Sequence, residues 1–81
     1  MGYRENLKNW VREALGKLGG RASINDVARQ IWLDHEHDLR EAGEYFYSWQ
    51  YDMRWAAQAL RDKGALSVHK AGSKNVWVLK P

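Results

Sequence analysis

Four polar side chains recur at helical spacing in the second half of the chain: Gln50, Arg54, Gln58 and Arg61. At 3.6 residues per turn they share one side of a helix, and Ala57 is expected among them. Arginine pairs bidentately with guanine and glutamine with adenine in the major groove of DNA, and a small alanine lets a helix approach the bases closely. Solvated helix faces carry the same residue types, so the spacing alone fits either a DNA contact or a face that binds nothing.

A second polar group follows in the segment 70–75, Lys-Ala-Gly-Ser-Lys-Asn. Apolar runs at 66–68 and 76–79 flank this segment, which predicts a β-hairpin with 70–75 as its loop. Positive and small polar side chains at a hairpin tip suit phosphate or minor-groove contact, and an ordinary exposed loop is the alternative. The loop residues expected to contact DNA are Lys70, Ser73, Lys74 and Asn75.

Two amphipathic helices are predicted before this unit. In the first, over residues 4–18, the apolar positions recur every three or four residues, and Gly19-Gly20 ends the helix. Arg21-Ala22 leaves room for only a short bridging strand. Ser23 is placed to cap the second helix, which we expect to end between residues 34 and 42. Its inner face is expected to consist of Ile24, Val27, Ala28, Ile31 and Trp32.

The third helix is predicted over residues 49–63, with Gly64 ending it. Its apolar side is expected to comprise Trp49, Met53, Ala56, Ala59 and Leu60. The rings just before it and in its first turn, Tyr45, Phe46, Tyr47, Trp49 and Tyr51, could stack on unpaired bases. We expect them to pack in the core instead, because so small a domain is short of apolar material.

Charge is distributed unevenly along the 81 residues, which we expect to form a single domain, 1–81. Residues 48–81 carry six Lys or Arg against two acids, whereas residues 33–47 carry five acids against one arginine. The helix-hairpin unit is therefore the basic part of the chain, as an anionic partner requires.

Several classes of function are disfavoured. Without cysteine the chain has neither a disulfide framework nor a thiolate metal site, and a reducing cytoplasm is the expected compartment. His35 and His37 point in different directions on a helix, so no metal site and no cofactor is expected. Neither a Gly-rich phosphate loop nor a Ser-His-Asp grouping is recognisable, so we expect no enzyme activity. No membrane partner is expected, because no run of about 18 apolar residues exists.

The order helix, short strand, helix, connector, helix, strand, loop, strand predicts an α+β winged helix-turn-helix, with three helices packed on a C-terminal two-stranded hairpin. From Ser23 onward the sequence also resembles the N-terminal domain of Mrr-type restriction endonucleases. The resemblance lies in the segments Ser23-Ile24, Arg54-Trp55-Ala56, Leu60, Gly64-Ala65-Leu66 and Val76-Trp77-Val78-Leu79. Asn75 stands where that family commonly has glycine, and the connector 45–49 is more aromatic than expected for it.

The resemblance implies a DNA-binding module attached to a catalytic domain, and its residues support the fold more than any target. We therefore expect a non-enzymatic module that binds double-stranded DNA through the third helix and the hairpin. The alternative is a winged-helix domain that docks a protein, catalytic or otherwise, through the acidic and aromatic segment 34–51.

Overall fold

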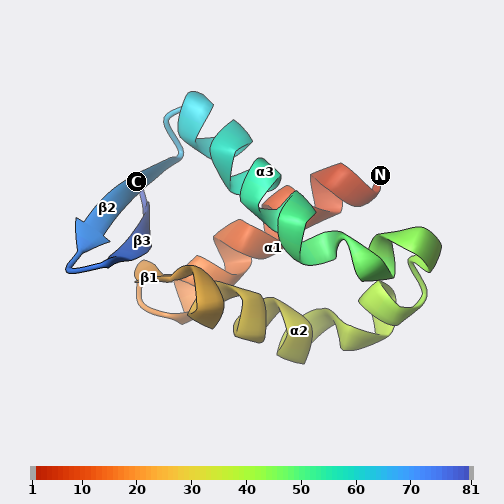
Figure 1. Cartoon of the computed structure of the whole chain (residues 1–81). Coiled ribbons are helices and arrows are strands. Elements are labelled where there is room, and N and C mark those ends of the chain that lie inside the picture. Colours follow the sequence, from red (N-terminus) through yellow and green to blue (C-terminus); the bar gives the residue numbers. More distant parts are fainter. Residues whose placement is uncertain (1, 81) are drawn as a thin grey trace.

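The computed structural model describes residues 2–80, which form three α-helices and a three-stranded antiparallel sheet (Figure 1). The elements are α1 (Tyr3–Lys17), β1 (Arg21–Ser23), α2 (Ile24–Arg40), the 3₁₀ helix η1 (Gly43–Tyr47), α3 (Trp49–Asp62), β2 (Leu66–Ala71) and β3 (Lys74–Leu79). The predicted α+β class is confirmed, and the order is compatible with a winged-helix-like fold. None of the helices in the described part of the chain has the length and apolar character needed to cross a membrane.

The sheet has the order β1-β3-β2, so the last strand lies in the middle. The bridging strand predicted at Arg21-Ala22 is present and pairs with β3, where Ala22 lies opposite Trp77. On the other side β2 pairs with β3 over its whole length, from Leu66 opposite Leu79 to the turn. Because the central strand joins two segments about fifty residues apart in sequence, it ties the hairpin to the start of α2.

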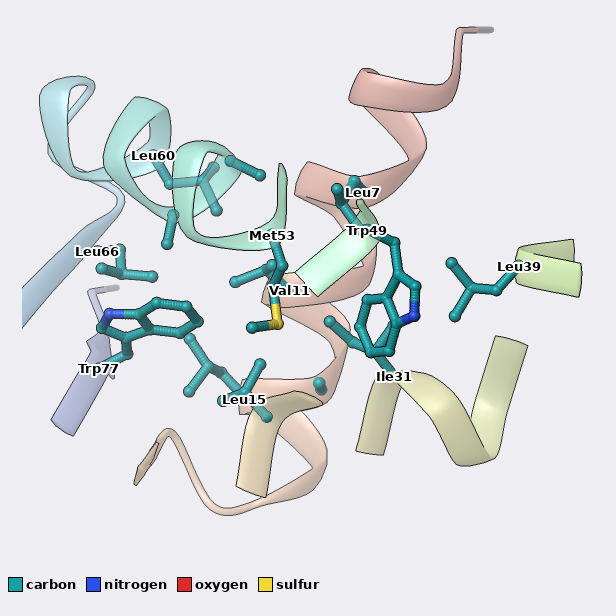
Figure 2. Close-up of a cluster of buried hydrophobic side chains, with 14 residues drawn as sticks. Leu7, Val11, Leu15, Ile31, Leu39, Trp49, Met53, Leu60, Leu66 and Trp77 are labelled. Carbon is teal, nitrogen blue, oxygen red and sulfur yellow. The ribbon is translucent and has the colours of Figure 1, made fainter. Parts of the chain in front are cut away.

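The core lies between the three helices and one face of the sheet (Figure 2). Each helix buries most of the apolar stripe expected from its 3.6-residue period, and Trp77 of β3 covers the sheet side of the same cluster. Burying each large apolar side chain contributes about 1.5–3 kcal/mol. The buried residues are Leu7, Val11, Ala14, Leu15, Val27, Ile31, Leu39, Trp49, Met53, Ala56, Ala57, Leu60, Leu66 and Trp77.

The second helix begins and ends where the sequence indicates. The Ser23 hydroxyl accepts the backbone N–H of Asp26 at 3.2 Å, which satisfies one of the free donors of the first turn. The helix ends at Arg40, inside the expected window, after a non-helical residue at His35 (φ −132°). The turn that follows this kink presents Leu39 to the core.

The hairpin differs from the prediction in its loop. The strands continue to Ala71 and from Lys74, so Gly72-Ser73 is the whole turn instead of a loop over 70–75. Gly72 has a φ of +68°, the conformation that a tight two-residue turn requires at its first position. The predicted loop was too long because polar residues can pair through their backbones just as apolar ones do.

The aromatic connector also differs from the prediction. Tyr47 and Tyr51 are 89% and 77% exposed, and only Trp49 of the five rings is fully buried. Tyr45 lies flat on Tyr3 at a ring distance of 4.0 Å, still partly exposed. Core packing was expected for these rings, with one or two exposed rings as the mark of a protein-protein surface; three are exposed, because the one-turn η1 can direct only some of its closely spaced rings inward.

Candidate nucleic-acid interface

The outward side of α3 carries four of the predicted contact residues. Gln50, Arg54, Gln58 and Arg61 are all exposed, whereas Met53 and Leu60 on the other side are buried. The Gln58 amide donates a hydrogen bond to Asp62 Oδ1 at 3.0 Å, one turn further along. This side of the helix is therefore polar and accessible over most of its length.

Ala57 is not part of that exposed side. It is 2% exposed and belongs to the core cluster, while Ala59, expected inside, is only half-buried. Ala57 lies four residues after Met53 and three before Leu60, so the helical period itself puts it on their buried side, and its assignment to the polar side was wrong. The hairpin packs toward the Ala57 side of α3, because Ala57 and Trp77 line the same depression.

The hairpin holds the other predicted contact residues in a defined register. Lys70 lies opposite Asn75 and Lys74 opposite Ala71, with Ser73 in the turn. Alternation along β3 puts Asn75 on the same face as Trp77, the face toward α3, and Lys74 on the opposite face. All four predicted residues, Lys70, Ser73, Lys74 and Asn75, are exposed.

Two adjoining depressions connect α3, the hairpin and the start of α2. The first, of about 230 Å³, is lined by Arg54, Gln58 and Arg61 from α3 and by Asn75 from β3. The second, of about 450 Å³, shares Arg54 and Asn75 with the first and adds Lys74 and residues of α2. We call the surface defined by Arg29, Arg54, Arg61, Lys74 and Asn75 the basic groove.

One carboxylate, Asp26, also lines the second depression, but among the described residues it forms no ion pair with the cations of the basic groove. Among residues 2–80, no ion pair involves Arg29, Arg54, Arg61 or Lys74. By contrast, Lys17 pairs with Asp34 at 2.9 Å and Arg40 with Glu36 at 2.8 Å elsewhere on the surface. Four free cations along a concave surface attract an anion with several regularly spaced charges.

Sequence reasoning missed one residue of this surface. Arg29 was assigned no role, yet it lines the groove with Asn25 one turn before it. Nothing in the local sequence indicates which outer residues of the second helix face the third, so only the tertiary packing reveals Arg29.

The acidic residues of segment 34–51 lie outside the basic groove. Asp34 accepts hydrogen bonds from Lys17 and from Gln30 at 3.0 Å, and the bond from Lys17 does most to lower the pKa of Asp34. The same bond raises the pKa of Lys17. Leu33 and Tyr47 are largely exposed at this end of the molecule. The segment thus combines exposed apolar side chains with acids, part of whose charge is already paired.

The histidines of this segment do not converge on a common point with other ligand residues. His35 stacks on Trp10 at 4.1 Å, and its ring nitrogens lie 3.1 Å from Glu13 and 3.6 Å from Asp38. His37 is exposed. Over the described range 2–80, no group of three or more His, Cys, Asp or Glu residues is arranged to hold a metal ion.

Comparison of the chain with models of known protein families, with curated proteins and with solved structures found no match. The resemblance to the N-terminal domain of Mrr-type endonucleases stays a prediction from the sequence.

Proposed function

We propose that this chain is a winged helix-turn-helix module, non-enzymatic in itself, that binds double-stranded DNA. In this proposal α3 enters the major groove and the β2–β3 hairpin, as the wing, contacts the flanking backbone. The element order and the central position of β3 are compatible with that fold. A chain of 81 residues without cysteine suits the cytoplasm, which we propose as its compartment.

The observation that carries the proposal is the row of free cations in the basic groove. Arg29 from α2, Arg54 and Arg61 from α3, and Lys74 from the hairpin come from three separate elements and form no ion pair within residues 2–80. A solvated surface without a partner would gain nothing from gathering like charges, which repel one another. The backbone of duplex DNA is a polyanion with one phosphate per nucleotide, so it can contact several of these cations at once.

The exposed side of α3 suits base recognition. The major groove is about 12 Å wide and admits an α-helix with its side chains. Arg54 would pair with guanine, and Gln50 or Gln58 with adenine. Lys70, Ser73 and Lys74 at the hairpin end would contact phosphates, which fix the orientation of the helix without reading sequence.

The test compares two double variants on fluorescently labelled duplexes. A preferred sequence is first selected from random duplexes, and affinities for it and for a random duplex are measured by anisotropy. Arg54→Ala combined with Gln58→Ala should cost about 1–3 kcal/mol on the preferred sequence and reduce the difference in affinity between the preferred and the random duplex. Lys70→Ala combined with Lys74→Ala should weaken binding to both duplexes about equally.

Both double variants change exposed side chains, so the thermal unfolding curve serves as the check that each remains folded. A folded Arg54→Ala, Gln58→Ala variant that binds every duplex as the parent does would refute the role of α3. Parent protein that binds no duplex at low salt would refute the proposed function as a whole.

A second candidate function is protein docking through segment 34–51. The exposed Tyr47 and Tyr51 favour it, because large exposed aromatic side chains are enriched at protein interfaces. A Glu41→Lys, Glu44→Lys variant separates the two functions: it should bind duplex DNA at least as tightly as the parent, whereas docking of a basic protein partner should be lost.

A further inference from the structure

A cleft of about 530 Å³ lies between α2, η1 and α3, beside the basic groove and larger than either of its depressions. Its volume falls within the range typical of small-ligand sites, about 300–1,000 Å³. We call it the aromatic cleft. Its lining residues are Asn25, Ala28, Arg29, Trp32, Phe46, Trp49 and Gln50.

The rings of this cleft are held in place by their surroundings. Trp49 is 5% exposed and belongs to the core cluster, as Figure 2 shows. Trp32 is parallel to Trp49 within 13° and has the Arg40 guanidinium over its ring at 5.2 Å. Arg40 is not among the residues that line the cleft. Phe46, from η1, lies 6.2 Å from Trp32, has the Arg40 guanidinium 5.9 Å from its ring and remains partly exposed. Because Trp49 is almost fully buried, the exposed parts of Trp32 and Phe46 are the surface on which a planar ligand could stack.

The polar residues of the cleft narrow the class of ligand. Asn25 and Gln50 have amide side chains, each with both donors and an acceptor, which match the hydrogen-bonding edge of a nucleobase. Arg29 adds one positive charge at the same site. All three side chains are exposed, so each can exchange a water for a polar group of the ligand.

The cleft is continuous with the basic groove. Asn25 and Arg29 line both the aromatic cleft and the α2 side of the groove. A strand whose phosphates contact Arg29 therefore passes the opening of the cleft, and a base attached to that strand is within reach of the rings. The shared arginine favours a base on a nucleic-acid strand over an unattached planar molecule.

We propose that the aromatic cleft binds an unpaired base of a nucleic-acid strand whose backbone lies in the basic groove. The proposal rests on the proposed function, because the groove has to hold the strand. The base is one that is already unpaired, at an overhang or a bulge, since extracting a paired base costs the free energy of its pair and its stacking. The chain would then recognise junctions between paired and unpaired DNA in addition to duplex.

The test uses three duplexes of identical paired sequence. One is blunt, one carries an overhang of unpaired thymidines, and one carries an overhang of abasic sugar phosphates with the same number of charges; overhangs at both the 5′ and the 3′ end are prepared. The overhang with bases should bind about tenfold more tightly than the abasic overhang, because stacking on aromatic side chains contributes of that order for each base. Equal affinity for the two overhangs, with binding of the blunt duplex retained, overturns the cleft proposal and leaves the proposed function intact.

Variants at Phe46 assign the effect to the cleft. Phe46→Leu, which removes the ring, should abolish the preference for the overhang with bases, and Phe46→Tyr, which keeps it, should preserve the preference. Both should leave binding of the blunt duplex unchanged; an unchanged preference in a folded Phe46→Leu variant contradicts the proposal.

A competition experiment separates a base on a strand from a free nucleotide. Free thymidine monophosphate, at the same concentration as the overhang duplex, should not displace that duplex. Displacement would overturn the proposal and assign the cleft to mononucleotides. If the parent protein binds none of the three duplexes, the proposed function itself is overturned.

Discussion

Replacing Lys74 by alanine should make DNA binding less sensitive to salt, by the amount that corresponds to the loss of one phosphate contact. Lys74 lies beside the turn of the hairpin, is exposed, and forms no ion pair among the described residues. Its replacement should therefore disturb neither the core nor another side chain. What it removes is one positive charge from the basic groove, and with it the counterion that this contact releases from DNA.

The magnitude follows from the number of cations available for phosphates. If Arg54 contacts a base, four cations are left to contact phosphates: Arg29, Arg61, Lys70 and Lys74. Each phosphate contact contributes about −0.9 to the slope of log affinity against log salt, so the expected slope is about −3.6. Raising monovalent salt from about 50 mM to about 200 mM should then weaken binding about 150-fold. In Lys74→Ala the slope should be about −2.7 and the same change in salt should weaken binding only about 40-fold.

Lys17→Ala is the matched control, because it removes the same charge from outside the groove, where Lys17 is already paired with Asp34. Its slope should equal that of the parent. The measurement is a set of anisotropy titrations on one labelled duplex at four salt concentrations. An affinity that does not change with salt, or equal slopes for Lys74→Ala and the parent, would refute the assignment of the groove to phosphate binding.

Three further predictions concern stability. Met53→Ala and Leu60→Ala should each lower the free energy of unfolding, measured by urea titration, by about 2–5 kcal/mol, because both side chains are buried in the core. A decrease below about 1 kcal/mol would contradict their placement. Ser23→Ala should cost about 1 kcal/mol of the free energy of unfolding by the same measurement, because it removes the cap of α2; an unchanged free energy of unfolding would contradict the capping role. Tyr3→Phe should cost about 1 kcal/mol at neutral pH, because the Tyr3 hydroxyl donates to Asp52 Oδ2 at 3.0 Å. Burial and then that bond raise the pKa of Tyr3 from its ordinary value of 10.0, so its contribution is complete below pH 10.0 and declines as pH rises further. Thermal unfolding of parent and variant from pH 8 to pH 11 measures this, and a difference that grows with pH would contradict the assignment.

The sequence by itself determined the helices and most of the core. Met53 and Leu60 lie seven residues apart, two helical turns, so any helix through this segment puts them on one side. Ser23 followed by Asp26 fixes the start of α2 because the capping bond is local to those residues. The β-branched and apolar run before Leu79 pairs wherever a partner strand is available, so the hairpin was also predictable.

Tertiary structure decided the features that depend on contacts between distant segments. Spacing from Met53 and Leu60 puts Ala57 on their side of α3, but only the packing shows that the hairpin is the element beside it. Arg29 joins the basic groove only because β1 pairs with β3 and so brings the start of α2 next to the hairpin. The aromatic cleft likewise needs Trp32 and Phe46, from α2 and η1, to meet α3. A periodic pattern specifies which side of an element is buried, but the element that covers it and the surface they form together depend on packing across the whole chain.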